Sequence, residues 1–449
     1  MQRVETMNRR EALKLLGISG MGLMGSNLSA ETKLSMPSTK KHARIVIAGG
    51  GTAGMIAAAR VRRAAPNAKI IMISPNTRHI YQSGQLWVAA GLSDGSAYVR
   101  KTTDLLPDGV TWLRESVTAF DPDHNSVTAS KSGKVVYDIL IVALGAAYDY
   151  DAIEGLDTSM IGKEGIASVY YNDTLKGEAQ GGFLSRGVFA KLQEEARRRH
   201  VEFLCTEPDT PVKGEGTTLS LLFLGNDRLH QHGVNKRVRF TLAKAGEELF
   251  ASPLFRKRLQ KEVERYDNIR QAYGFSLMAI DIGAKKARFD TPDGTHEMRY
   301  DFIHIVPPHR APKVLADSPL AVPEGKEKGW MANDGKNLLH PKYNNVFGIG
   351  DILAGTPGKS GGAAQHQGII LQDNIAAALE EKPLPYSYDG YTVAPIITKE
   401  GKILMAEYNS RKVLPTLPLD PMESRKFWWY FQKDFMPWLY FNMLMRGMM

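Results

Sequence analysis

A glycine-rich turn between an apolar strand and an alanine-rich segment constrains the fold of this chain more than any other feature. The run Arg44–Ala48 has the composition of a buried strand, and Gly49, Gly51 and Gly54 follow it in the pattern G-x-G-x-x-G. The first glycine permits a tight turn, the second lets the backbone approach a pyrophosphate, and the third lets a helix pack closely on the strand. The segment predicts a dinucleotide-binding turn, with a glycine-rich turn that binds no ligand as the alternative.

The segments after this turn complete a βαβ unit. We expect a helix over 54–65, with Thr52 and Ala53 at the start that faces the phosphates, and a strand over 69–73. Ser74 ends that strand, where ribose-binding sites usually carry Asp or Glu. A serine hydroxyl makes fewer hydrogen bonds than a carboxylate, so the predicted ribose contact is weak.

Length, charge and cysteine content exclude several classes of function. The chain has 449 residues, enough for two or three domains, and a formal net charge of +9. Its basic residues form no long runs and do not alternate with aromatic residues, so we expect no nucleic-acid partner. Cys205 is the only cysteine, which excludes an intrachain disulfide and metal sites built on thiolate pairs. The histidines also predict no metal site.

Two later segments resemble the other cofactor-contacting turns of flavoproteins with two dinucleotide-binding domains. We expect one apolar strand over 135–145, which ends in a small-residue turn at Ala143 and Gly145, and another that ends at Gly350 and Asp351. The resemblance implies that the carboxylate accepts hydrogen bonds from the ribityl chain and pyrophosphate of FAD. A helix near 361–379 would then direct its N-terminus at the flavin ring. Without a second cysteine, we expect FAD to be bound non-covalently.

The predicted fold class is α/β, with two Rossmann-like domains and a C-terminal segment. Helices are expected over 185–199 and 253–265, and strands over 201–205 and 238–242. The second block lacks a G-x-G-x-x-G motif, which argues against a nicotinamide donor. The expected division is a signal peptide at 1–30, an FAD domain at 44–165 and 330–383, a second Rossmann-like domain at 166–329, and a C-terminal domain at 384–449.

Five segments resemble sulfide:quinone oxidoreductases, especially the subgroup that includes the mitochondrial enzyme. They are Thr210–Lys213, Tyr300–Pro308, Asn345–Asp351, Tyr388–Thr392 and Lys433–Tyr440. The resemblance implies an FAD-containing oxidoreductase that passes electrons from a small reductant to a quinone at the membrane surface.

The chain departs from this family at its redox cysteines. Gly214 stands where one cysteine follows the Thr-Pro-Val-Lys segment, and Ala394 occupies the matching place of the other. Neither residue can act as a sulfur nucleophile, so sulfide oxidation by the family's route is not expected. A thiolate or hydrosulfide that adds directly to the flavin remains an alternative donor. Two other readings are a flavocytochrome-type sulfide dehydrogenase subunit with a cytochrome acceptor, and a non-catalytic FAD-binding paralogue.

Three residues are candidates for catalysis. Lys359 would lie near the flavin after Asp351 and stabilise negative charge there, or else be a solvated loop lysine. His366 is a candidate proton donor for quinone reduction, with a structural role as the alternative. Cys205 ends an apolar strand and is read either as a small core residue or as a thiol that forms a mixed persulfide.

The two ends of the chain predict its location. Arg9-Arg10 precedes a short apolar run, which is typical of twin-arginine export, with a basic helix of a cytosolic protein as the alternative. The aromatic and basic tail from Phe427 predicts a peripheral membrane anchor with Pro437 dividing it into two helices. The alternative is a tail packed on its own domain, a second copy or a partner subunit. Because every flavin motif lies upstream, deletion from Phe427 onward is expected to leave FAD bound.

Overall fold

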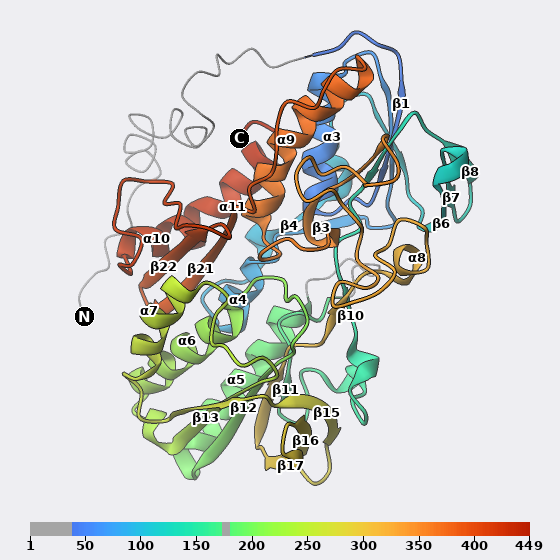
Figure 1. The fold of residues 1–449 in the computed structure, drawn as a ribbon. Helices are drawn as coiled ribbons and strands as arrows, with labels where there is room; N and C mark the ends of the chain where they lie inside the picture. Colours follow the sequence, from blue (N-terminus) through green and yellow to red (C-terminus); the bar gives the residue numbers. More distant parts are fainter. Residues whose placement is uncertain (1–37, 173–179) are drawn as a thin grey trace.

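The computed structural model describes residues 38–172 and 180–449, so the predicted signal peptide at 1–30 lies outside the described residues. Two parallel sheets with helices packed around them form the two main bodies of the fold (Figure 1). Their strand orders are β20–β9–β1–β2–β5 and β11–β18–β12–β13–β14. The chain is therefore an α/β protein with two Rossmann-like domains, which confirms the predicted fold class.

The first sheet is assembled from two distant parts of the chain. Its parallel strands are β1 (Arg44–Ala48), β2 (Lys69–Ile73), β5 (Val110–Leu113), β9 (Ile139–Val142) and β20 (Val346–Gly348). The run Ile45–Ile47 is fully buried, as expected for a parallel sheet covered on both faces. Helix α9 (Gly361–Leu379) lies along α3 (Thr52–Ala64), although about 300 residues separate the two in sequence (Figure 1).

The predicted single strand over 135–145 is wrong, because the chain turns in its middle. Strand β8 (Gly133–Val136) belongs to a small antiparallel sheet with β6 (Val117–Asp121) and β7 (Ser126–Ala129). The Asp138 carboxylate then accepts a hydrogen bond of 2.6 Å from the Arg44 backbone N–H, and the Asp138 N–H donates to the Arg44 carbonyl. These two bonds place the chain beside β1, where β9 begins.

The second domain has its own sheet and core. Its sheet consists of β11 (Ile166–Ala167), β12 (Val201–Glu207), β13 (Val238–Lys244), β14 (Ile269–Tyr273) and β18 (Phe302–Ile305). The helices of this domain are α5 (Gln180–Arg198), α6 (Thr217–Gln231) and α7 (Pro253–Val263). A meander of β15 (Ser276–Asp281), β16 (Lys286–Thr291) and β17 (Gly294–Arg299) adjoins it (Figure 1).

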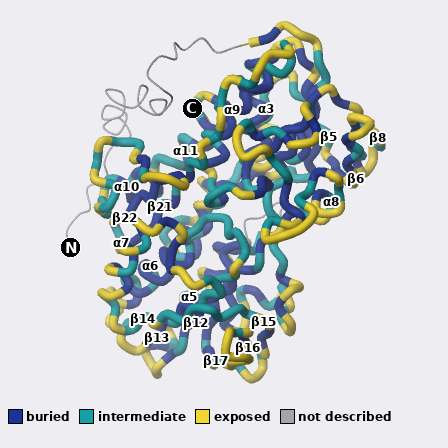
Figure 2. The backbone as a smooth tube through the Cα atoms, in the orientation of Figure 1, coloured by how far each residue is buried: buried dark blue, intermediate teal, exposed yellow. Residues whose placement is uncertain are grey.

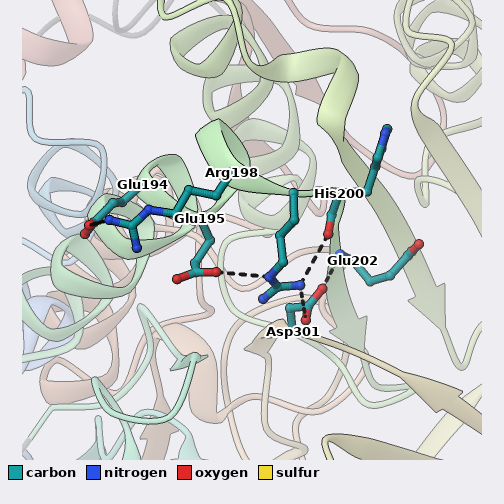
Figure 3. Close-up of polar contacts among 7 residues, drawn as sticks. Glu194, Glu195, Arg198, His200, Glu202 and Asp301 are labelled. Atoms are coloured by element: carbon teal, nitrogen blue, oxygen red, sulfur yellow. Dashed lines mark hydrogen bonds and ion pairs between the residues drawn. The ribbon is translucent and has the colours of Figure 1, made fainter.

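A polar network fixes the end of α5 against this sheet. The Arg199 guanidinium lies 3.0 Å from Glu195 and 2.7 Å from Asp301 (Figure 3). Asp301 also accepts a 2.8 Å hydrogen bond from the Glu202 backbone N–H at the start of β12. The network therefore joins the chain on either side of the α5–β12 turn to the residue that precedes β18.

Short elements connect the larger ones. They are β3 (Arg78–Ile80), β4 (Val99–Lys101), α4 (Gly84–Ala89), β10 (Ala147–Tyr148), β19 (His309–Arg310) and α8 (Lys313–Ala316). Strands β10 and β19 pair where the chain leaves the first domain and where it returns from the second. A hairpin of β21 (Thr392–Lys399) and β22 (Lys402–Tyr408) precedes the tail.

The tail is one irregular helical run rather than two helices separated by proline. Helices α10 (Lys426–Tyr430) and α11 (Met436–Leu439) alternate with π-helical turns over 431–435 and 440–444. Pro437 lies where the first π-helical turn passes into α11, and it does not end the run. Much of the tail is buried (Figure 2). Among the residues that the structure describes, none of the helices has the length and apolar character needed to span a bilayer.

Candidate functional site

The glycines of the 49–54 turn permit contacts that a side chain would block. Gly49 has a φ of 115°, and a Cβ atom on it would lie 2.3 Å from the carbonyl oxygen of Ala143. A Cβ on Gly54 would lie 2.0 Å from the carbonyl oxygen of Gly49. Close packing at these points therefore requires glycine, and it brings the turn after β9 against the turn after β1.

Gly51 differs because it faces open space. No atom of the described chain lies within 4 Å of a Cβ built on it. Helix α3 begins directly afterwards, with no side-chain cap among the described residues and no acidic residue in its first turn. The first N–H groups of α3 therefore remain available to an anion, and the turn fits a dinucleotide pyrophosphate.

The third predicted segment, which ends at Gly350 and Asp351, lies against the first turn of α3. Gly350 has a φ of 84°, and a Cβ on it would lie 2.6 Å from the Cβ of Ala53 in the first turn of α3. The side chain of Gln367 on α9 accepts a 2.7 Å hydrogen bond from the Gly350 N–H. Asp351 follows with 17% of its side chain exposed. Its carboxylate thus comes from the segment that lies beside the start of α3.

Two further predicted cofactor residues border these turns. Gly145 has a φ of 70°, and a Cβ on it would meet no described atom within 4 Å. Ser74 is buried, its carbonyl accepts a 2.8 Å hydrogen bond from the indole of Trp112, and its side chain would collide with a Cβ on Gly50. Ser74 therefore supports the glycine-rich turn directly.

Lys359 and His366, the predicted catalytic residues, lie in different surroundings. The Lys359 ammonium donates hydrogen bonds to the carbonyls of Asp351 (2.7 Å) and Leu353 (3.1 Å) and is nearly fully buried. Burial lowers its pKa to about 8. His366 on α9 lies 3.9 Å from the Asp389 carboxylate, and burial lowers its pKa below the usual value. Lys359 is thus bonded to the Asp351 segment, whereas His366 faces the segment just before β21.

A cluster that the sequence did not indicate lies next to Asp351. The Lys213 ammonium is 3.9 Å from the Asp351 carboxylate and 3.3 Å from the hydroxyl of Tyr148 on β10. The ring of His309 packs edge-on against Tyr148, and its Nε2 has no hydrogen-bond partner within the described parts of the chain. Burial lowers the His309 pKa to about 3, so this imidazole is neutral. Of these residues, the sequence indicates only Lys213, as part of the Thr-Pro-Val-Lys segment.

The two positions at which the sequence predicts a missing cysteine belong to segments that contact the start of α9. The Gly214 N–H donates a 3.0 Å hydrogen bond to the carbonyl of Lys359. The N–H of Val393, the neighbour of Ala394, lies 3.4 Å from the hydroxyl of Ser360, which caps α9. Both segments therefore contact the residues just before α9, and neither Gly214 nor Ala394 supplies a thiol there.

Cys205 is placed elsewhere. It lies on β12 between β13 and β18 and is fully buried in the core of the second domain. Burial raises the pKa of its thiol well above the ordinary value. A buried, protonated thiol is a poor nucleophile, which favours the reading of Cys205 as a core residue.

Comparisons with known proteins agree with this geometry. Residues 43–176 match the family described as pyridine nucleotide-disulphide oxidoreductase. The chain is 31% identical over 415 residues to the mitochondrial sulfide:quinone oxidoreductase of Dictyostelium discoideum, with 91% of this chain and 87% of that protein covered.

Solved structures share the fold at lower identity. The sulfide:quinone oxidoreductase from the hyperthermophilic bacterium Aquifex aeolicus matches with a TM-score of 0.71 at 21% identity, covering 89% of this chain and 91% of that chain. A chain in the cryo-EM structure of the Tetrahymena thermophila mitochondrial ATP synthase matches with a TM-score of 0.76 at 17% identity, covering 93% and 98%. At these identities the matches establish a common fold.

Proposed function

The chain belongs to the sulfide:quinone oxidoreductase family, and we propose that it passes two electrons from a small reductant to a quinone at a membrane surface. It is an FAD-dependent oxidoreductase, in which bound FAD supplies the two-electron carrier. One observation carries the proposal: the 49–54 turn meets the Gly350–Asp351 turn, Lys359 just before α9 bonds to Asp351, and the segments around Gly214 and Ala394 contact the same helix start.

The charge beside this site supports an anionic donor. Burial lowers the pKa of Lys213, but its neighbours Tyr148 and Asp351 raise it by more, so its ammonium stays charged at neutral pH. The Lys359 ammonium lies in the same region. Because no cysteine can relay sulfur, we propose a thiolate or hydrosulfide donor that reaches the flavin directly. Two such donors would together lose two electrons to the flavin and leave joined by a new S–S bond.

Anaerobic reductant screening tests the proposal. The purified protein should show a flavin spectrum, a thiolate or sulfide should bleach it, and decylubiquinone in detergent should restore it. Restoration by a cytochrome but not by quinone would favour the flavocytochrome-type alternative. A stable flavin that no reductant bleaches would favour a non-catalytic paralogue. The missing cysteines are the observation that keeps this third reading open.

We also propose that the FAD is non-covalent, since the one cysteine of the chain is buried in the second domain. Acid precipitation should release the yellow colour into the supernatant. Colour that stays with the precipitated protein would contradict this proposal.

For location, we propose export by the twin-arginine route and peripheral attachment to the membrane on the periplasmic side. The first part rests on Arg9-Arg10, outside the described residues. The second part rests on the exposed edge of the tail, where Trp438 is 44% exposed. Replacing both arginines with lysine should retain the protein in the cytoplasm, and unchanged periplasmic recovery would refute the route.

A further inference from the structure

The C-terminal tail contacts the glycine-rich turn through one tyrosine. Tyr440 is 4% exposed, and its hydroxyl lies 2.6 Å from Oγ1 of Thr52 and 2.7 Å from Nε2 of His79. Thr52 is the first residue of α3, and so borders the open space in front of Gly51. A residue near the end of the chain is therefore bonded to the cradle that fits the cofactor's pyrophosphate.

His79 in this chain of hydrogen bonds is neutral. Burial lowers its pKa to about 4, despite a hydrogen bond to the backbone of Gly50 that opposes the shift. A neutral imidazole has one N–H and one acceptor nitrogen, and a hydroxyl both donates and accepts, so the Tyr440 hydroxyl can bridge Nε2 of His79 and Oγ1 of Thr52 in either direction. In both directions the Thr52 hydroxyl is held toward Tyr440.

The tail also contacts the C-terminal end of α3. The Arg63 guanidinium, in the last turn of α3, donates to the carbonyls of Arg446 and Gly447. A Cβ on Gly447 would lie 3.2 Å from the Cβ of Ala59, so the tail packs directly on the helix. Both ends of α3 are thus bonded to the last ten residues of the chain.

We propose that the tail is a structural part of the FAD site, with Tyr440 as a positioning residue for Thr52 and Gly50. FAD binding and seating of the tail then stabilise one another, because linkage between two sites is reciprocal. The proposal rests on FAD binding at the 49–54 turn, and it is independent of the donor and the acceptor. It predicts, against the expectation from the sequence, that deletion from Phe427 onward weakens FAD binding, since that deletion removes Tyr440.

The test compares Tyr440→Phe with Tyr430→Phe. Tyr430 lies in the same tail, half-buried, and its hydroxyl makes no hydrogen bond within residues 38–172 and 180–449. Titration of the apoprotein with FAD should show Kd raised on the order of tenfold for Tyr440→Phe and unchanged for Tyr430→Phe. Thr52→Val removes the other partner of the Tyr440–Thr52 hydrogen bond. The double variant Tyr440→Phe/Thr52→Val should lose little more FAD affinity than the weaker-binding of the two single variants. Unchanged affinity in Tyr440→Phe, or fully additive losses, would overturn the proposal.

A second measurement needs no variant and no turnover. In the wild-type protein, FAD should slow hydrogen exchange of the amides over 436–449 relative to the apoprotein. Equal exchange in the two forms would show that the tail seats independently of the cofactor. Neither measurement uses a reductant or a quinone, so a failure here is distinct from a failure of the proposed reaction.

Discussion

Replacing Gly51 with alanine tests whether the open space in front of the turn belongs to the cofactor. Gly51 has a φ of −73° and a ψ of −165°, an extended conformation that alanine adopts without strain. The added methyl group meets no described atom within 4 Å. The apoprotein should therefore lose at most about 1 kcal/mol of stability, since alanine is a poorer N-cap than glycine.

The added methyl group should instead weaken the binding of FAD. An extra methyl group in a close-packed contact costs about 1–3 kcal/mol, which corresponds to a rise of roughly 5- to 150-fold in the FAD Kd. Fluorescence titration of the apoprotein gives the Kd, and urea unfolding without FAD gives the stability of the fold. An unchanged Kd would refute the assignment of this space to the pyrophosphate.

Two other glycines provide matched controls. At Gly54 the new Cβ would collide with the backbone of Gly49, so Gly54→Ala should destabilise the apoprotein itself. Gly187 is exposed inside α5 and has no described atom within 4 Å of a built Cβ. Gly187→Ala should stabilise the fold by about 0.5–1 kcal/mol and leave the FAD Kd unchanged. Loss of stability in Gly51→Ala as large as in Gly54→Ala would contradict the reasoning.

Four further predictions concern the charged and cysteine-matched positions. Asp351→Ala should weaken FAD binding on the order of 2 kcal/mol, measured by the same titration. The pKa of Lys359 is about 8 in the folded protein, compared with 10.5 for an ordinary lysine. Between these two pH values the folded protein has lost this proton while the unfolded chain still holds it. The free energy of unfolding should therefore rise by ~3 kcal/mol across this window. Urea unfolding of apo Lys359→Met should lack that rise, and an identical slope would contradict it. Sulfide-dependent decylubiquinone reduction should fall far below ~10 s⁻¹. Gly214→Cys should cost about 1–2 kcal/mol of stability, because Gly214 has a φ of 69°, whereas Ala394→Cys should cost less.

The parts of the site that depend on local pattern were predictable from the sequence. The predicted strands over 44–48 and 69–73 and the helix over 361–379 have the bounds seen in the structure. Each is followed by a glycine or a polar residue and carries a clear apolar pattern. The glycine spacing likewise fixes a turn whose geometry depends on a few neighbouring residues.

The cluster around Lys213 was not predictable in this way. Tyr148, Lys213 and His309 are distant in sequence, and pairing of β10 with β19 brings two of them together. No local signal marks such a contact, because it follows from how the two domains pack. The same is true of Tyr440, whose bond to Thr52 spans 388 residues.

The tail shows why composition alone left two readings open. Aromatic side chains suit both a protein core and a membrane interface, so their density does not separate the two. Of the eight aromatic residues between Phe427 and Tyr440, four are buried and four are not: the buried ones are Trp428, Trp429, Phe431 and Tyr440, and the others are Phe427, Tyr430, Phe435 and Trp438. Of the second set, Phe427, Tyr430 and Phe435 are partly buried and pack against the same core, and only Trp438 is exposed. Most of the aromatic side chains therefore serve the core that holds α3, and a membrane contact by this part of the tail would have to begin at Trp438.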